Sequence, residues 1–560
     1  MFKQILFLLL LLLTAPAIGQ ETFTFESDTK PVIKGKLIGY NQEVDTILSI
    51  TASLVVPSAE FQSAKDIPIE TDGTFQLTLD YPIANRQIWL RVGEYYFGEL
   101  LFSEEIMVTI DLVNLKKIEK EYFHSEYVQF SGVDGPLTDY MNRFTSYRQS
   151  LEDNPYKEML LVKRNEDLSI SERLAQMRIH QKEVIQVRED FIAKNPSEHA
   201  WVLKNEAVSD FYSEVSTLYW GKEMSQDLLE EVLAHEPKFI SNAGASYYRG
   251  LGFYFKGMSL QEYADNYKMA VLPTIVDAGE KQRLLDFIDL YQLRVDEQEY
   301  DKKKFGTESK YFFKTYKKEI NTGHHKRFAA KLKKQNLPPE KEAIVISCAG
   351  SDDIWGQELY LSLLISSVQS NWVLNFMQKE WAKSNSVIDQ VNQELAQLDI
   401  EGQNSVLGIP KGKLDNGSEF FLPEQTELLQ LIAAIRAEHP DKAIILDLWA
   451  TWCGPCISDM KAPTTAPNKK KLKEMGVEVI YLCTNSGSKE ETWRKKVAEL
   501  DMGPGKHLFL NDALASKMLT YFQLSGYPSY VFIDANGQYK PDVVERIYNI
   551  DFDKVKKNIR

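Results

Sequence analysis

The sequence is poor in cysteine, with only four among 560 residues. This scarcity excludes a scaffold held together by many disulfides, and it makes the position of each cysteine informative. Positive charge is also in deficit, because 65 Lys and Arg residues face 80 Asp and Glu, for a formal net charge of −15. A nucleic-acid-binding protein would present a basic domain, so we expect no nucleic-acid partner.

Internal repeats are missing as well, since no segment recurs at a fixed period, and a regular solenoid is therefore not expected. The hydrophobic fraction of 44% is that of an ordinary globular protein, which excludes wholesale disorder. The length exceeds what one core normally holds. At ~100–200 residues per domain, it predicts about three or four units.

The start of the chain carries its most apolar run. Lys3 supplies a positive charge, nine apolar residues follow from position 5 to 13, and Ala17-Ile18-Gly19 ends the segment with a plausible cleavage signal. This plan predicts a secretory signal peptide over residues 1–19. A retained membrane anchor is the alternative, although a spanning helix needs ~20 apolar residues. We expect an exported protein with no stable membrane insertion after signal cleavage.

Residues 20–118 show short apolar and β-branched runs with near-alternation, for example at 32–37 and 87–92. The turn signal Asp72-Gly73 separates two such runs, as a hairpin requires. The pattern predicts an N-terminal all-β sandwich. No cluster of residues at catalytic or ligand spacing occurs here, which favours a packing or docking role.

Residues 119–400 change to a helical period, with apolar residues at i, i+3, i+4 and i+7 in runs such as 170–194, 281–293 and 388–398. The sequence therefore predicts a helical middle region. The adjacent pair His324-His325 would point in different directions from a helix, so a metal site there is not expected. A linker-like stretch at 401–405 ends this region.

Residues 405–560 alternate strand and helix, which is typical of an α/β domain. A hairpin is expected at 411–422, with Asn416-Gly417 at its turn. Strands are expected at 443–449, 477–483, 507–510 and 529–534, and helices at 426–438, from Cys453, at 490–500, at 513–522 and from Asp551.

Cys453-Gly454-Pro455-Cys456 follows directly after the strand expected at 443–449. Cys453 would lie at a helix N-terminus, where unpaired N–H groups and the helix dipole favour a thiolate and lower the thiol pKa below ~8.5. Cys456 lies nearly one helical turn further on, so it can reach the same sulfur from deeper inside. Pro455 suits the first turn of a helix.

A C-x-x-C pair can also bind zinc or form an inert structural disulfide. Zinc needs two further ligands, whereas Cys348 and Cys483 are solitary and no His pair follows at a suitable spacing. The residues favour a redox-active dithiol over both alternatives. Cys348 and Cys483 are expected to be buried free thiols rather than a second redox pair.

Trp452-Cys453-Gly454-Pro455-Cys456, together with the later Gly526-Tyr527-Pro528 before a strand, resembles the active site and cis-proline loop of the thioredoxin fold. The additional strand and helix at 477–485 and 490–500 are similar to the insert of exported TlpA/ResA-like thiol-disulfide oxidoreductases. The resemblance covers residues 405–560. The front of the chain is more loosely similar to a module fused ahead of such domains in Gram-negative bacteria, which implies a periplasmic protein of the cell envelope.

This resemblance assigns catalytic roles to three residues. Cys453 matches the attacking thiol and Cys456 the resolving thiol of thiol-disulfide exchange. Asp447 matches a buried acid with a raised pKa, which relays a proton to or from Cys456. An acid at an exposed strand end is the alternative for Asp447.

The resemblance also implies a substrate-binding surface around the cis-proline loop, formed by Trp452, Gly454, Pro455, Tyr527 and Pro528. Protein disulfides and thiols would be its substrates, and a membrane-embedded thiol would be its electron donor. Neither a cofactor nor a metal is implied.

Two departures from the family pattern appear. Tyr481 stands where many thioredoxins carry a lysine near the buried acid, and Pro463 is expected to break the active-site helix at a shifted position. Gly-Pro between the cysteines resembles the reducing variants, with potentials near −270 mV rather than −120 mV. An exported reductase of partner-protein disulfides is therefore predicted. The alternatives are a disulfide isomerase or oxidase, and a binding or assembly protein with an accessory redox domain.

Overall fold

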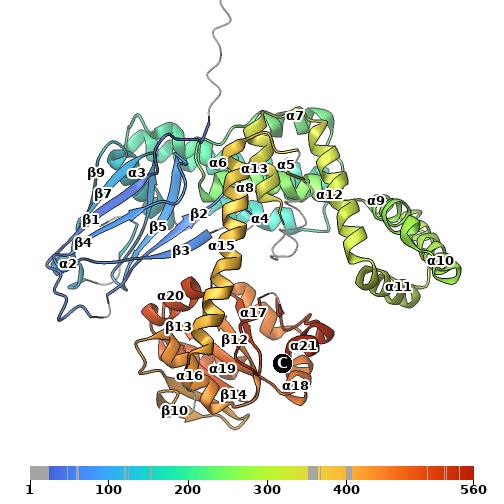
Figure 1. Ribbon diagram of the computed structural model, residues 1–560. Helices are drawn as coiled ribbons and strands as arrows, with labels where there is room; N and C mark the ends of the chain where they lie inside the picture. Colours follow the sequence, from blue (N-terminus) through green and yellow to red (C-terminus); the bar gives the residue numbers. More distant parts are fainter. Residues whose placement is uncertain are drawn as a thin grey trace, which may run out of the picture.

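The computed structural model describes residues 24–560 except 47, 59–61, 119–120, 124, 152–153, 351–363, 366, 399–405, 501, 523, 525 and 542. The predicted signal peptide and the linker at 401–405 lie outside the described residues. Within the described ranges, no helix is long and apolar enough to cross a membrane. Figure 1 shows β-sheets at the front of the chain, helices in the middle and an α/β domain at the C-terminal end.

Two β-sheets, here called the front sheets, occupy residues 32–131. The first has the order β4-β1-β7-β9, and the second has the order β3-β2-β5-β6-β8. β1 and β7 pair in parallel, whereas β2, β3, β5 and β6 pair antiparallel. The strands are β1 (Val32–Ile38), β2 (Ile50–Val55), β3 (Gln62–Ile67), β4 (Thr74–Thr78), β5 (Arg86–Val92), β6 (Tyr96–Phe102), β7 (Glu105–Asp111), β8 (Glu121–Tyr122) and β9 (Val128–Ser131), with the short helix α2 (Leu112–Leu115) after β7.

The turn expected at Asp72-Gly73 forms, with an antiparallel bridge between Ile69 and Phe75 across it, but the strands on either side do not pair with each other as a full hairpin. β3 pairs with β2 in one sheet, and β4 pairs with β1 in the other. Gly73 has a φ of +82°, so the chain does turn there. The turn leads from β3 in one sheet to β4 in the other.

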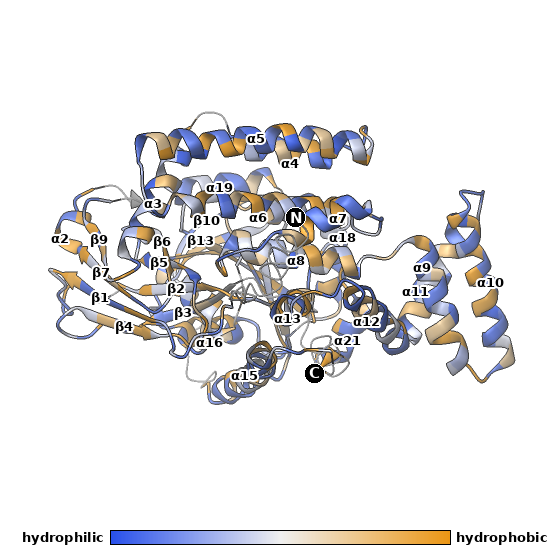
Figure 2. Ribbon diagram, turned by 90° about the horizontal axis from the view of Figure 1, so that it is seen from above, coloured by the Kyte–Doolittle hydropathy of each residue, from blue (hydrophilic) through white to orange (hydrophobic). Residues whose placement is uncertain are grey.

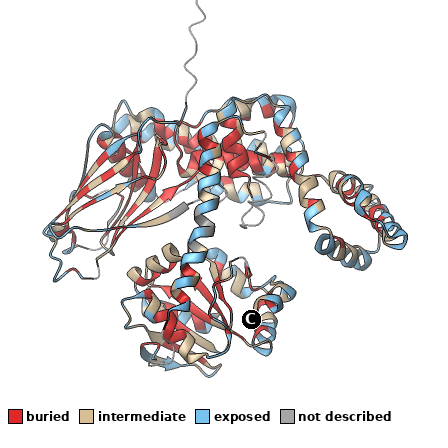
Figure 3. Ribbon diagram, viewed as in Figure 1, coloured by how far each residue is buried: buried red, intermediate tan, exposed pale blue. Residues whose placement is uncertain are grey.

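The front sheets share their hydrophobic core with the helices that follow. Ile33 of β1 and Ile88 of β5 belong to the same buried cluster as Val215 of α6 (Ala200–Leu218) and Ile344 of α13 (Pro339–Cys348). In Figure 3 buried residues run from the strands into the neighbouring helices. The all-β sandwich expected for residues 20–118 therefore stays a prediction, since the core continues across residue 118.

The helical periodicity of the middle region is confirmed most clearly in α5 (Ile170–Lys194). Ser169 caps this helix in a capping box with Glu172, which fixes its first residue. Figure 2 shows polar and apolar residues alternating along α5, as expected of a half-buried helix. The other helices of this region are α3 (Gly135–Gln149), α4 (Pro155–Arg164), α7 (Gln226–Ala234), α8 (Asn242–Lys256) and α12 (Lys317–Lys333).

A helical lobe stands apart at the right of Figures 1 and 2. Tyr267, Phe287 and Phe312 form the centre of its own buried cluster, which is separate from the front core. The helix expected at 281–293 lies within this lobe. Its elements are α9 (Leu260–Asn266), η1 (Tyr267–Val271), η2 (Leu272–Thr274), α10 (Ala278–Val295) and α11 (Lys302–Thr315).

A single long helix, α15 (Asn371–Ala396), joins the front of the molecule to the C-terminal domain (Figure 1). Val373 and Phe376 at its start belong to the front core, whereas Val391 and Leu395 near its end belong to the core of the C-terminal domain. The helix expected at 388–398 is only the last part of α15. The earlier part falls within the helical region expected at 119–400.

The C-terminal domain is a six-stranded sheet of order β10-β11-β14-β13-β12-β15, with helices packed around it. All seven residues of β12 are buried, which confirms the expected buried strand, and β12 lies between β13 and the edge strand β15. The α/β alternation is confirmed throughout. The strands are β10 (Ile409–Lys413), β11 (Ser418–Leu422), β12 (Ala443–Trp449), β13 (Val477–Thr484), β14 (Gly505–Leu510) and β15 (Ser529–Ile533), and the helices are α16 (Leu428–Glu438), α17 (Gly454–Lys461), α18 (Thr465–Glu474), α19 (Glu490–Glu499), α20 (Asp512–Tyr521) and α21 (Phe552–Asn558).

Candidate active site

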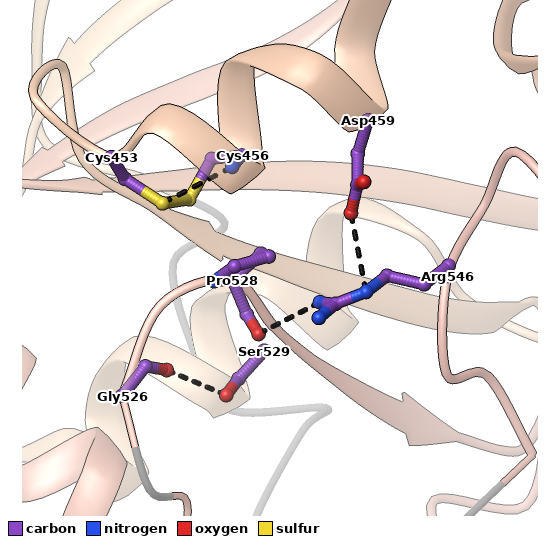
Figure 4. The surroundings of a disulfide bond; sticks show 7 residues. All are labelled: Cys453, Cys456, Asp459, Gly526, Pro528, Ser529 and Arg546. Atoms are coloured by element: carbon purple, nitrogen blue, oxygen red, sulfur yellow. Dashed lines mark hydrogen bonds and ion pairs between the residues drawn. A yellow bond between two sulfur atoms is a disulfide. The ribbon is translucent and has the colours of Figure 1, made fainter. Parts of the chain in front are cut away.

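A disulfide joins Cys453 and Cys456 where β12 gives way to α17, with Cα atoms 5.3 Å apart (Figure 4). Both cysteines are buried, at 3% and 1% exposure, whereas Gly454 and Pro455 are exposed and Trp452 is 57% exposed. The disulfide is therefore sheltered beneath a rim that faces solvent.

Cys453 is the N-cap of α17, as the sequence predicts. Its sulfur accepts a hydrogen bond from the backbone N–H of Cys456 at 3.2 Å. The same N–H and the positive end of the helix dipole would stabilise a thiolate on Cys453 after reduction. Helix α17 ends at Lys461 and α18 begins at Thr465, so the helix breaks around Pro463, where the sequence indicates a break.

The loop before β15 faces the disulfide in Figure 4. Its Tyr527–Pro528 peptide bond is cis, and Ser529 Oγ donates a hydrogen bond to the carbonyl of Gly526 at 2.6 Å. The rings of Tyr527 and Trp452 meet edge to face, with centroids 6.1 Å apart. The structure thus brings together all five side chains or backbone segments that the sequence assigns to substrate binding.

Asp447 lies on β12, between two neighbouring strands, and is only 1% exposed, so an exposed strand end is wrong for this residue. Its strand neighbours are Tyr481 on β13 and Tyr530 on β15. Its Oδ1 is buried and has no hydrogen-bond partner among the described residues. Burial raises the pKa of Asp447 to about 7, which outweighs the nearby charge of Lys469.

Tyr481 occupies the strand position opposite Asp447, and the positive charge near the acid comes from another element. Lys469 of α18 places its Nζ 4.6 Å from the centroid of the Tyr481 ring. Both residues line a cavity of about 320 Å³ beside the sheet, together with Met460 and Thr465. This arrangement connects the surroundings of the buried acid to a cavity between α18 and the sheet.

A contact that the sequence did not reveal ties the active-site helix to the cis-proline loop. Arg546 donates a hydrogen bond from Nη1 to the carbonyl of Pro528 at 3.1 Å, and its Nε lies 3.3 Å from a carboxylate oxygen of Asp459 in α17 (Figure 4). Arg546 comes from the segment after β15, which has no periodicity that would mark it. Its charge also lowers the pKa of Asp447.

The two remaining cysteines are free and buried, as expected. Cys348 belongs to the front core and Cys483 to the cluster around the disulfide, so they cannot pair with each other. Burial raises the pKa of Cys348 to about 12 and that of Cys483 well above its usual value. Across the described residues, no group of three or more His, Cys, Asp or Glu side chains could hold a metal ion.

Residues 432–555 match the family model described as Redoxin. The C-terminal domain, which contains β12, the disulfide and the cis-proline loop, therefore matches this family. The resemblance noted in the sequence is confirmed for this part of the chain. We refer to it below as the redox domain.

Solved structures similar to this domain carry related names. They include the thioredoxin domain of a thiol-disulfide oxidoreductase from Bacteroides vulgatus, which is 18% identical in sequence. The match covers 22% of this chain and 79% of that chain, with a TM-score of 0.18. A thiol:disulfide interchange protein from Chlorobium tepidum has 23% identity, 22% and 85% coverage and a TM-score of 0.18. A secreted disulfide oxidoreductase from Mycobacterium tuberculosis has 17% identity, 22% and 84% coverage and a TM-score of 0.17. No curated protein sequence matches the chain.

Proposed function

We propose that this protein is exported and reduces disulfides of partner proteins. The observation that carries the proposal is the disulfide between Cys453, at the N-terminus of α17, and the deeper Cys456, with the buried Asp447 in the strand that precedes this helix. A dithiol that can close into this disulfide gives up two electrons, which is what the reduction of one partner disulfide requires.

The reaction would begin when the Cys453 thiolate attacks one sulfur of the partner's disulfide. The S–S bond of the partner breaks, its other sulfur leaves as a thiolate and takes up a proton, and a mixed disulfide with Cys453 forms. Cys456 then loses its proton and attacks the Cys453 sulfur. This second step releases the reduced partner and leaves the Cys453–Cys456 disulfide.

Asp447 suits the second step, because Cys456 must lose a proton inside the protein. A carboxyl group with a pKa of about 7 is present in both protonation states near neutral pH, as a proton acceptor and donor must be. We infer that Asp447 accepts the proton of Cys456 during resolution and returns a proton when the disulfide is reduced again.

The direction of electron flow follows from the Gly454-Pro455 pair, which resembles reducing thioredoxin-like sites. Equilibrating the full chain with glutathione buffers and quantifying the Cys453–Cys456 disulfide measures the potential of this couple. We expect a value near ~−270 mV. A value near ~−120 mV would contradict a reductase and support an oxidase, and an intermediate value near ~−180 mV would support an isomerase.

Export is supported by the charged, apolar and small-residue segments within residues 1–19. Expression with this segment in a Gram-negative host, followed by N-terminal sequencing of the periplasmic fraction, tests it. We expect a chain that begins near residue 20. A full-length chain in the cytoplasm would contradict export, and with it the need for a membrane-embedded thiol donor.

A binding or assembly protein with an accessory redox domain is the second candidate. It is favoured by one observation, which is that the front sheets and the middle helices build a larger core of their own, apart from the core of the redox domain. Cells that carry only the Cys453→Ser, Cys456→Ser chain distinguish the two functions. The reductase predicts the defect of a complete deletion, whereas a binding protein predicts normal growth.

A further inference from the structure

A cleft of about 420 Å³ lies between the front sheets and the redox domain. Its volume falls within the ~300–1,000 Å³ of ordinary ligand pockets. In Figure 1, β3 and α20 face each other across this boundary. The front sheets supply one wall and the redox domain supplies the other, through residues that include Leu48, Glu94, Tyr95, Asn485, Asn511 and Asp512.

Polar contacts beside the cleft hold the two walls together. Arg91 of β5 donates a hydrogen bond from Nη1 to Ser486 Oγ at 2.8 Å, and the same nitrogen lies 3.4 Å from a carboxylate oxygen of Asp512. The hydroxyl groups of Thr51 and Ser516 are also hydrogen-bonded, at 2.9 Å. The front sheets are thus docked on the loop after β13 and on the start of α20.

The same loop forms part of the active-site rim. The indole N–H of Trp452 donates a hydrogen bond to the carbonyl of Ser486 at 2.6 Å. Gly487 has a φ of +63°, and a Cβ atom there would lie 3.0 Å from the indole nitrogen, so the loop passes close to the ring. Ser486 therefore contacts both the rim and Arg91, and its neighbour Asn485 lines the cleft.

The cleft offers hydrogen-bonding groups and an excess of negative charge. Asn485 Oδ1 is buried and has no hydrogen-bond partner within the part of the chain that the structure describes. Asp45 is paired with Lys116, and Asp512 is paired with Arg91. Glu94 is exposed, and among the described residues it has no ion-pair partner.

We propose that this cleft binds a polypeptide segment of the partner protein that flanks the target disulfide and carries a basic side chain. The inference rests on the proposed reductase function, because a bound partner disulfide at the Trp452 rim brings its flanking residues to the adjoining cleft. Asn485 lines the cleft and can form a hydrogen bond with the main chain of the segment. Glu94 attracts its basic side chain, and Leu48 and Tyr95 offer apolar contact.

The probes are two peptides, each cyclised by a disulfide. They differ only at the position beside one cysteine, which is Arg in one peptide and Gln in the other. Binding is measured with the Cys453→Ser chain, which retains the cleft and cannot react. We expect this protein to bind the Arg peptide about two- to five-fold more tightly than the Gln peptide, as one partly exposed charge pair allows. Addition of Glu94→Lys is expected to abolish or invert the preference.

Glu104→Lys is the matched control, because Glu104 is an exposed carboxylate beyond the opposite end of β6 from Glu94. The control is expected to keep the preference for the Arg peptide. Equal binding of both peptides, or a preference that survives Glu94→Lys, would overturn the proposed cleft.

Reduction of hydroxyethyl disulfide by the full chain with both active-site cysteines separates this proposal from the proposed function. This small uncharged substrate does not extend into the cleft, so Glu94→Lys should leave its turnover unchanged. If the unmodified protein fails to reduce it, the reductase is wrong, while the binding preference still decides the cleft. If Glu94→Lys slows the reduction of hydroxyethyl disulfide by as large a factor as it weakens binding of the Arg peptide, the effect on the peptide does not come from the cleft.

Discussion

At the scale of single residues, the raised pKa of the buried Asp447 is the most distinctive property of this site. Asp447 pairs with a tyrosine on each neighbouring strand of the sheet, and burial raises the pKa of its carboxyl group to about 7. In the unfolded chain the same group would titrate near ~3.9. The folded state therefore binds this proton more tightly than the unfolded state does.

Asp447→Asn should stabilise the oxidised protein in a pH-dependent way. As the pH rises from about 4 to about 7, the unfolded chain ionises Asp447 before the folded chain does, so wild-type stability falls over this window. The variant lacks this loss. The gain in its free energy of unfolding over the wild type should be absent below pH ~4. Above pH ~7 this gain should reach at most about 4 kcal/mol, because one pKa unit corresponds to about 1.4 kcal/mol.

Urea unfolding of both oxidised proteins at several pH values measures this difference, with the disulfide intact so that no thiol of the pair titrates. An advantage for Asp447→Asn that is the same at pH 4 and pH 8 would contradict a raised pKa. In the reduced protein the same variant should slow the release of the mixed disulfide, since Cys456 loses its proton acceptor.

Arg546 is expected to position the cis-proline loop and to tune Asp447 at the same time. Arg546→Met removes the hydrogen bond to the Pro528 carbonyl and the ion pair to Asp459, and it should raise both the KM for protein disulfides and the pKa of Asp447. Arg546→Lys keeps the charge without the paired geometry. It should restore the pKa and leave the KM raised.

The pH dependence of mixed-disulfide release reports the pKa of Asp447, and steady-state kinetics report the KM. Arg546 does not act through the loop if Arg546→Lys restores both the KM and the pKa of Asp447. The same conclusion holds if Arg546→Met changes neither quantity. Sequence reasoning could not find this residue, because it lies outside every periodic segment and meets Pro528 only through the fold.

At the scale of elements, α15 has two functions in packing. Its first turns complete the front core and its last turns complete the core of the redox domain. Leu395→Ala should cost the redox domain about 2–5 kcal/mol, because it leaves a cavity where a fully buried leucine packs. The exposed Gln393→Ala should change stability by less than about 0.5 kcal/mol.

Hydrogen exchange of the β12 amides follows the stability of the redox domain separately from that of the front core. Faster exchange in Leu395→Ala, but not in Gln393→Ala, is expected. Unchanged β12 exchange in both variants would mean that α15 packs only at its first end.

The elements of the redox domain were predictable because clear turn residues separate their apolar runs. The strand at 443–449 is apolar except for Asp447, and Gly417, with a φ of +88°, marks the hairpin before it. The front sheets were less predictable. Alternation identifies strands such as β1 and β4, but it does not say which strands pair, and the parallel pairing of β1 with β7 joins segments far apart in the sequence.

At the scale of the whole molecule, two cores are held together by α15 and by polar contacts between distant residues. Arg91 and Ser486 are 395 positions apart, and Thr51 and Ser516 are 465 positions apart. Such contacts leave no local pattern in the sequence. The motif predicts the chemistry of Cys453, whereas the docking of the front sheets beside that site emerges only from the fold.

Thiol-disulfide exchange at Cys453 is the first step of the proposed reaction in the intact protein. The direct measurement is mass spectrometry of the reduced Cys456→Ser chain after incubation with insulin, a protein that carries disulfides. We expect a covalent adduct linked through Cys453, because its resolving thiol is gone. Cys453→Ser should form no adduct. An adduct with Cys453→Ser, or the absence of an adduct with Cys456→Ser, would contradict thiol-disulfide exchange at Cys453.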